Sequence, residues 1–184
     1  MKRRKFLVTS AALTAFGSDL MAFSQKNKED DPGFLVKSGD ARHGKHTPFN
    51  GINPNDLKIS SKDTAGQLSV FEYIGMEKTG PALHVHLEQD EVFYVVAGEY
   101  LFQLGHQQYE LSEGDTIFLP RNIPHTWIQT SGRGKLVYFL QPAFKMEEFF
   151  QAMTDIGRPP TAEEAQKISL AHGIKLVGPP LTLK

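Results

Sequence analysis

The stretch GPALHVHLEQDE, residues 80–91, contains the residues that decide the fold. His84 and His86 are two residues apart, so on a β-strand their imidazoles project from the same face. Glu91 lies five residues after His86, and this odd spacing would place it on the opposite face of an unbroken strand. We therefore expect a turn at residues 88–90 that returns Glu91 to the face of the two histidines.

A second stretch, GDTIFLPRNIPH at residues 114–125, supplies a third imidazole. Pro120 and Pro124 make the loop before His125 rigid, and His125 opens a new strand. The chain has no cysteine, which excludes disulfide bonds, thiolate ligands and a cysteine nucleophile. Three imidazoles and one carboxylate suit one divalent transition metal (Mn, Fe, Co, Ni, Cu or Zn) better than Ca or Mg. We predict the metal ligands to be His84, His86, Glu91 and His125; the alternative is an exposed His-x-His pair on a strand with an unrelated carboxylate and an unrelated histidine.

Short apolar runs separated by turn residues fill the middle of the chain, from Gln67 to Gln141. Turn signals recur about every ten residues, which is typical of an all-β sandwich or barrel. No helix of ordinary length fits between them, so an alternating βα arrangement is disfavoured. The predicted strands cover residues 67–75, 81–87, 91–97, 99–104, 107–111, 115–119, 125–130 and 135–141.

The two quoted stretches resemble the two sequence motifs of the cupin superfamily, with Gly98 following the first motif. The arrangement of arm, barrel and tail is similar to that of single-domain, quercetin 2,3-dioxygenase-like cupins. This resemblance implies an all-β antiparallel jelly-roll cupin barrel with the metal inside, and a homodimer. The chain departs from the family pattern at Asn122, where glycine is common, and at Gln129, where asparagine is common. Neither departure removes a ligand.

The walls of the cavity are expected to be apolar. Trp127 has the same strand parity as His125, and we predict that it lines a substrate pocket with Phe93 and Phe139. Packing in the barrel core is the alternative for each of the three. Such walls favour an aromatic or enolic small molecule over a bare sugar.

Three functions are compatible with this site. The first is a metal-dependent dioxygenase in which Glu91 is both ligand and catalytic proton acceptor. The second is a non-redox isomerase, epimerase or lyase acting on a sugar-like or keto-acid substrate. The third is a small-ligand-binding module without turnover. We favour the dioxygenase, and fold alone does not decide among the three.

The segments on either side of the barrel differ from it in composition. Residues 25–66 are polar and rich in Gly and Pro, which predicts an N-terminal arm rather than a second domain. The barrel domain is predicted at residues 67–142. In residues 143–184, Met146, Phe149, Phe150 and Met153 follow a helical spacing. A second helix begins after Thr161, so we predict a short C-terminal helical extension that acts as a cap, lid or dimer contact.

The first 24 residues have the composition of a signal peptide. Lys2, Arg3, Arg4 and Lys5 precede a short stretch of apolar and small residues. The paired arginines resemble a twin-arginine signal, which predicts export to the periplasm with no stable membrane anchor after cleavage. The alternative is an ordinary signal or an unstructured leader. A formal net charge of −1 gives no indication of nucleic-acid binding.

Overall fold

A computed structural model describes residues 33–183 of the chain. The predicted signal peptide, residues 1–24, lies outside the described residues. The fold lies within the compact unit that begins at Leu35. No helix in the part of the chain that the structure describes is long and apolar enough to cross a membrane.

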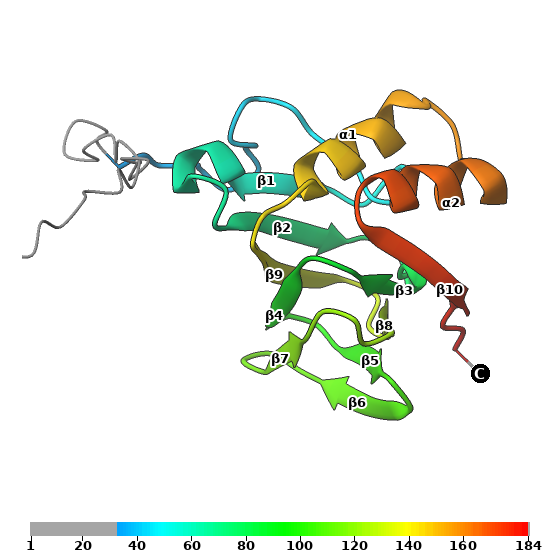
Figure 1. Cartoon of the computed structure of the whole chain (residues 1–184). Coiled ribbons are helices and arrows are strands. Elements are labelled where there is room, and N and C mark those ends of the chain that lie inside the picture. Colours follow the sequence, from blue (N-terminus) through cyan, green and yellow to red (C-terminus); the bar gives the residue numbers. More distant parts are fainter. Residues whose placement is uncertain (1–32, 184) are drawn as a thin grey trace, which may run out of the picture. The chain divides into compact units, whose positions relative to one another are not determined.

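Two five-stranded antiparallel sheets face each other and form the barrel (Figure 1). The strand orders are β1-β2-β9-β4-β7 in one sheet and β10-β3-β8-β5-β6 in the other. This arrangement confirms the predicted all-β antiparallel barrel. The strands are β1 (Asn55–Ile59), β2 (Ser69–Gly75), β3 (Ala82–His86), β4 (Asp90–Ala97), β5 (Tyr100–Leu104), β6 (Gln107–Leu111), β7 (Thr116–Leu119), β8 (His125–Gln129), β9 (Gly134–Gln141) and β10 (Ile174–Pro180).

Side chains that alternate along each strand fill the barrel interior. On β9, Leu136, Tyr138 and Leu140 are buried, whereas the residues between them are partly exposed. The aromatic rings of this core pack against one another, as in the stacked pair Tyr138 and Phe93 at 5.0 Å between centroids. Burial of so many large apolar side chains is the main source of the barrel's stability.

Each sheet is extended by one strand that the sequence pattern did not predict. In the N-terminal arm, β1 pairs with β2 and places Asn55 opposite Tyr73. Near the other end of the chain, β10 pairs with β3 and places Ile174 opposite His86. The arm and the tail are therefore parts of the two sheets.

Two helices, α1 (Met146–Asp155) and α2 (Ala162–Ala171), follow the barrel strands. Both lie at the same end of the molecule as β10 in Figure 1. A capping box at Thr161 and Glu164 starts α2, as the sequence predicts. The apolar stripe of α1 packs on the barrel core through Met146 and Phe150.

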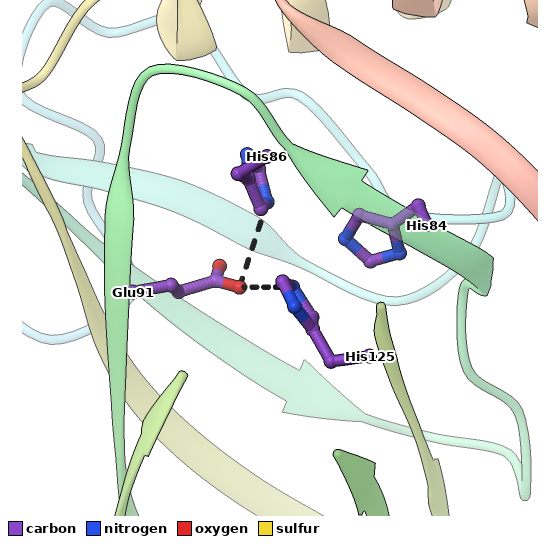
Figure 2. A group of neighbouring side chains, drawn as sticks. All are labelled: His84, His86, Glu91 and His125. Carbon is purple, nitrogen blue, oxygen red and sulfur yellow. Dashed lines mark ion pairs between the residues drawn. The ribbon is translucent and has the colours of Figure 1, made fainter. Parts of the chain in front are cut away.

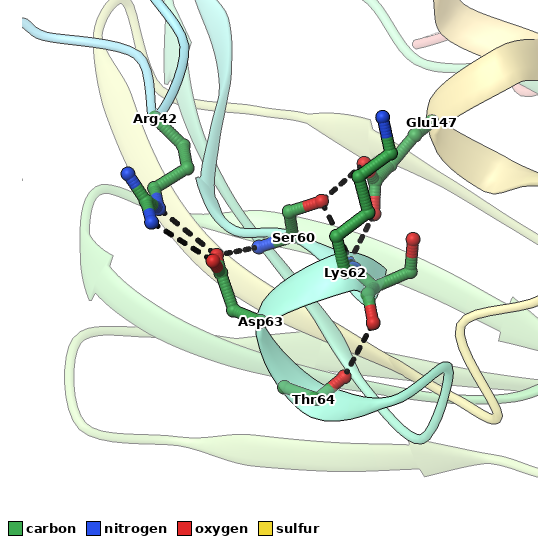
Figure 3. Close-up of polar contacts among 7 residues, drawn as sticks. Arg42, Ser60, Lys62, Asp63, Thr64 and Glu147 are labelled. Carbon is green, nitrogen blue, oxygen red and sulfur yellow. Dashed lines mark hydrogen bonds and ion pairs between the residues drawn. The ribbon is translucent and has the colours of Figure 1, made fainter. Parts of the chain in front are cut away.

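A carboxylate fastens α1 to the short 3-10 helix η2 (Ser61–Thr64), as Figure 3 shows. Glu147 accepts hydrogen bonds from the Ser60 hydroxyl at 2.8 Å, from the Ser61 amide at 2.5 Å and from the Ser69 hydroxyl at 2.8 Å. Ser60 and Ser69 are fully buried. This contact joins segments that lie 78 to 87 residues apart in the sequence.

Candidate metal centre

Four buried side chains converge inside the barrel, as Figure 2 shows. Strand β3 supplies His84 and His86, β4 supplies Glu91, and β8 supplies His125. One candidate ligand atom from each residue lies within 4.8 Å of the others. The structure thus brings together all the residues that the sequence proposes as ligands.

Strand register explains how these side chains meet. His84 lies opposite His125 in the pairing of β3 with β8, so their rings approach to 4.6 Å between centroids. The chain bends at Leu87 and Glu88, which returns Glu91 to the face of the two β3 histidines. The carboxylate Oε2 of Glu91 lies 3.3 Å from Nε2 of His125 and 3.6 Å from Nε2 of His86.

Hydrogen bonds to the backbone select the tautomer of two imidazoles. Nδ1 of His84 contacts the Ala82 carbonyl at 2.7 Å, and Nδ1 of His125 contacts the Ile123 carbonyl at 2.9 Å. Because a carbonyl only accepts, Nδ1 carries the hydrogen and Nε2 keeps a free lone pair. Those Nε2 lone pairs are the ones that can bind a cation.

Burial keeps the β3 imidazoles neutral. It lowers the pKa of His84 to about 3, helped by His125 and His86 and opposed by Glu91. Burial and His125 likewise lower the pKa of His86 to about 3. Neutral imidazole is the form that binds metals. Nε2 of His86 and Nε2 of His125 are buried without a hydrogen-bond donor or acceptor, so this donor set fits a divalent transition metal.

Neighbouring residues hold the candidate ligands in place. The Gln89 side chain raises the pKa of His86, against the effect of burial. Its amide nitrogen donates to the Ala143 carbonyl at 2.5 Å, which fixes the side chain beside His86. The backbone N–H of Asn122, a residue with a positive φ of 64°, donates to the His86 carbonyl at 2.8 Å. Sequence reasoning did not identify Gln89, because a buried glutamine in a polar bend resembles a solvated one.

A second polar contact fixes the loop that leads to His125. Arg121 donates to both carboxylate oxygens of Asp90, at 3.0 and 2.7 Å. The Arg121 backbone amide also donates to this carboxylate. The hydrogen bonds from Arg121 hold the pKa of Asp90 at about 2. The proline-bounded loop is therefore tied to the start of the strand that carries Glu91.

The candidate metal centre opens into a cavity of about 350 Å³. His84 and Glu91 lie in its wall, with Phe93 and Trp127 from the barrel. Both helices, which were predicted to act as a cap, lid or dimer contact, and the unpredicted strand β10 complete this wall. They contribute Met146, Phe149, Phe150 and Met153 from α1, Ala165 and Ser169 from α2, and Ile174, Leu176 and Pro180 from β10.

The structure corrects one member of the predicted substrate pocket. Phe139 is absent from the cavity wall, and Tyr138 lines the cavity in its place. In the pairing of β4 with β9, Glu91 lies opposite Leu140, so the inward positions of β9 are Leu140 and Tyr138. Phe139 faces the other side of the sheet.

Comparison with known proteins agrees with this geometry. Residues 71–140 match the Cupin_2 family model, described as a cupin domain. Quercetin 2,3-dioxygenase of Bacillus subtilis (strain 168) is 29% identical over 99 residues, which cover 54% of this chain and 29% of that enzyme. An uncharacterized protein of Methanocaldococcus jannaschii is 37% identical over 43 residues, which cover 23% of this chain and 34% of that protein. The chain thus spans about a third of the length of either relative.

A solved structure shares the fold at low sequence identity. An RmlC-like cupin from Shewanella frigidimarina NCIMB 400 superposes with a TM-score of 0.52 and 18% identity, covering 63% of this chain and 96% of that one. Residues 71–140 therefore resemble a cupin domain in sequence, and the two antiparallel sheets form a barrel with the cupin fold.

Proposed function

We propose that this protein is a metal-dependent dioxygenase that acts on a small aromatic or enolic molecule. One observation carries the proposal: a buried cluster of three imidazoles and a carboxylate opens directly into a cavity with an apolar, aromatic wall. A transition metal held by His84, His86, Glu91 and His125 would supply Lewis-acid and redox chemistry at the end of this cavity.

Glu91 is the residue proposed to handle the proton. It is the only carboxylate among the described residues that line the cavity, and it is 4% exposed. This carboxylate would act as the general base that takes the proton from a substrate hydroxyl in the cavity. Glu91 would therefore generate the enolate or phenolate, which is the electron-rich form that reacts with dioxygen.

The aromatic wall would bind and orient the substrate. Phe93, Trp127 and Tyr138 lie in it, and their flat faces favour planar ligands. A sugar-like substrate would need polar partners on most sides, whereas the wall is predominantly apolar. The similarity to Quercetin 2,3-dioxygenase supports the same class of reaction. Both oxygen atoms of dioxygen would enter the product, so the reaction needs no external reductant.

Metal loading followed by an oxygen-electrode assay tests the proposal. Metal-free protein is loaded separately with Mn, Fe(II), Ni and Cu and supplied with flavonols, catechols and β-diketones. We expect one ion per chain and oxygen uptake that depends on the organic substrate. His86→Ala and Glu91→Gln should abolish uptake, and the control His106→Ala, at an exposed hairpin histidine, should not.

Two results would contradict the proposal at different levels. Stoichiometric metal without oxygen uptake for any substrate would remove the dioxygenase and favour the isomerase or binding-module functions. Protein that binds none of the ions would remove the metal centre itself.

A further inference from the structure

We infer that Asn55 and Tyr73 form a second recognition point in the cavity, one that binds an oxygen atom of the ligand at the end remote from Glu91. Both residues line the cavity and are only 1% exposed. The amide Nδ2 of Asn55 and the hydroxyl Oη of Tyr73 are buried without a hydrogen-bond partner. Leaving such groups unpaired costs stability, so their presence in a cavity wall points to a ligand that pairs with them.

The oxygen end of the Asn55 amide pairs with a neighbouring side chain. The Tyr138 hydroxyl donates to Oδ1 of Asn55 at 2.6 Å. The oxygen end of the amide is therefore occupied, and Nδ2 is left as a donor. Asn53, in the same segment, differs: its Nδ2 donates to the Phe49 carbonyl and its Oδ1 accepts from the Met76 amide. Asn50, which also lines the cavity, is paired as well, because its Nδ2 donates to the Thr79 hydroxyl at 2.9 Å.

Strand register gives the separation of the two ends. Asn55 lies opposite Tyr73, and Tyr73 lies opposite Leu136 of β9. Glu91 lies opposite Leu140, four residues further along the same strand. At about 3.3 Å per residue, the backbone positions of Leu136 and Leu140 are about 13 Å apart along β9, which is an upper bound for side chains that lean toward each other. The ring pair of Tyr138 and Phe93 lies between them.

This separation defines the class of ligand. One end would bind at Glu91 through an enol or phenol, the middle would stack on aromatic rings, and the far end would present an oxygen to Asn55 and Tyr73. Because Nδ2 only donates, that oxygen must accept, as a hydroxyl or carbonyl oxygen does. The inference rests on the proposed function only for the enolic end, and it adds that the preferred aromatic substrate is oxygenated at both ends.

Binding of three probes to wild-type and variant protein tests the inference. The probes are 3-hydroxyflavone, 3,7-dihydroxyflavone and 3,4′-dihydroxyflavone, which share one enolic end and differ in a remote hydroxyl. Trp127 is the only tryptophan of the chain and lies in the cavity wall, so its fluorescence reports binding, with calorimetry as a check. We expect at least one dihydroxy probe to bind wild-type protein about tenfold more tightly than 3-hydroxyflavone.

Tyr73→Phe should remove this preference while leaving the affinity for 3-hydroxyflavone unchanged. Because the Tyr73 hydroxyl has no partner in the protein, the variant should unfold at the wild-type temperature or above it. Asn55→Asp keeps an acceptor for Tyr138, replaces the donor, and should also remove the preference. The control Tyr100→Phe changes a buried tyrosine outside the cavity wall and should retain it.

The inference is overturned if wild-type protein binds none of the probes, shows no preference, or keeps its preference in both Tyr73→Phe and Asn55→Asp. These titrations do not require turnover. Preference without oxygen uptake would refute the proposed dioxygenase and leave the recognition point standing. Oxygen uptake without a preference for a dihydroxy probe would support the dioxygenase and overturn the recognition point.

Discussion

The contact between Glu147 and the 3-10 helix gives a quantitative prediction for Glu147→Ala. The substitution removes three hydrogen bonds to a carboxylate and leaves the buried Ser69 hydroxyl without its partner. Bonds to a charged acceptor contribute about 1.5–3 kcal/mol each when buried, and partial exposure of Glu147 reduces this to about 1 kcal/mol each. The expected loss in the free energy of unfolding is therefore about 3 kcal/mol, or roughly 6–12 °C in Tm for a chain of this size.

Thermal unfolding followed by Trp127 fluorescence and circular dichroism measures this loss. The matched control is Glu148→Ala, which changes the exposed neighbour on the same helical turn. It should move Tm by no more than about 1–2 °C, the equivalent of 0.5 kcal/mol. Because α1 forms part of the cavity wall, Glu147→Ala should also weaken probe binding. Equal Tm shifts for the two variants would refute this account of how α1 is held.

The same carboxylate makes stability depend on pH. Burial acts to raise the pKa of Glu147, but hydrogen bonds from Ser61, Ser69 and Ser60 outweigh it and lower the pKa below the usual 4.5. Its contribution to stability is therefore complete above pH 4.5 and is lost as the pH falls through the lower folded-state value. The Tm difference between wild type and Glu147→Gln should be constant from about pH 7 to 5 and shrink below pH 4.5. A difference that grows on acidification would contradict this sign.

Three further tests address other parts of the site. A methyl group at Gly80 would lie 1.7 Å from the Trp127 carbonyl oxygen, so Gly80→Ala should cost about 3 kcal/mol in a urea titration; an unchanged midpoint would contradict the packing. Gln89→Ala should weaken metal binding about tenfold in a chelator competition, because the ligand imidazole of His86 loses a buried polar neighbour that favours its interaction with a cation. An unchanged affinity would exclude this role, and Gln89→Glu should retain the affinity. Phe93→Ala should weaken binding of 3-hydroxyflavone, whereas Phe139→Ala should not. Equal effects would contradict the register of β9, which turns Phe139 away from the cavity.

The sequence was most informative where apolar and polar residues alternate or where chemistry requires particular residues. The two motifs contain all four candidate ligands, and the spacing of Glu91 predicted the bend before β4. Turn residues located β2 to β9 closely, and the predicted strand at residues 107–111 coincides with β6. Export and the homodimer remain predictions.

Inward and outward faces were not predictable where both faces of a strand are apolar. In β9, every residue from Leu136 to Leu140 is apolar or aromatic, so the sequence does not show which alternate residues face inward. Only the register of the strand shows that Tyr138 does. The same ambiguity holds in β4, where Val92 to Val96 are all apolar or aromatic and the structure shows Tyr94 42% exposed. The β10 strand was missed because Gly178, Pro179 and Pro180 interrupt its pattern, and the structure accommodates them with shifts in register.

The pairing of β10 with β3 has a consequence for biosynthesis. The strand that carries His84 and His86 gains its outer partner only after Ile174 and Leu176 have been translated, some 90 residues after the histidines themselves. A nascent chain can assemble β2 to β9 while that edge of β3 is still unpaired. Ile174, Leu176 and Pro180 of β10 line the cavity, so its wall is complete only after this last strand has paired with β3.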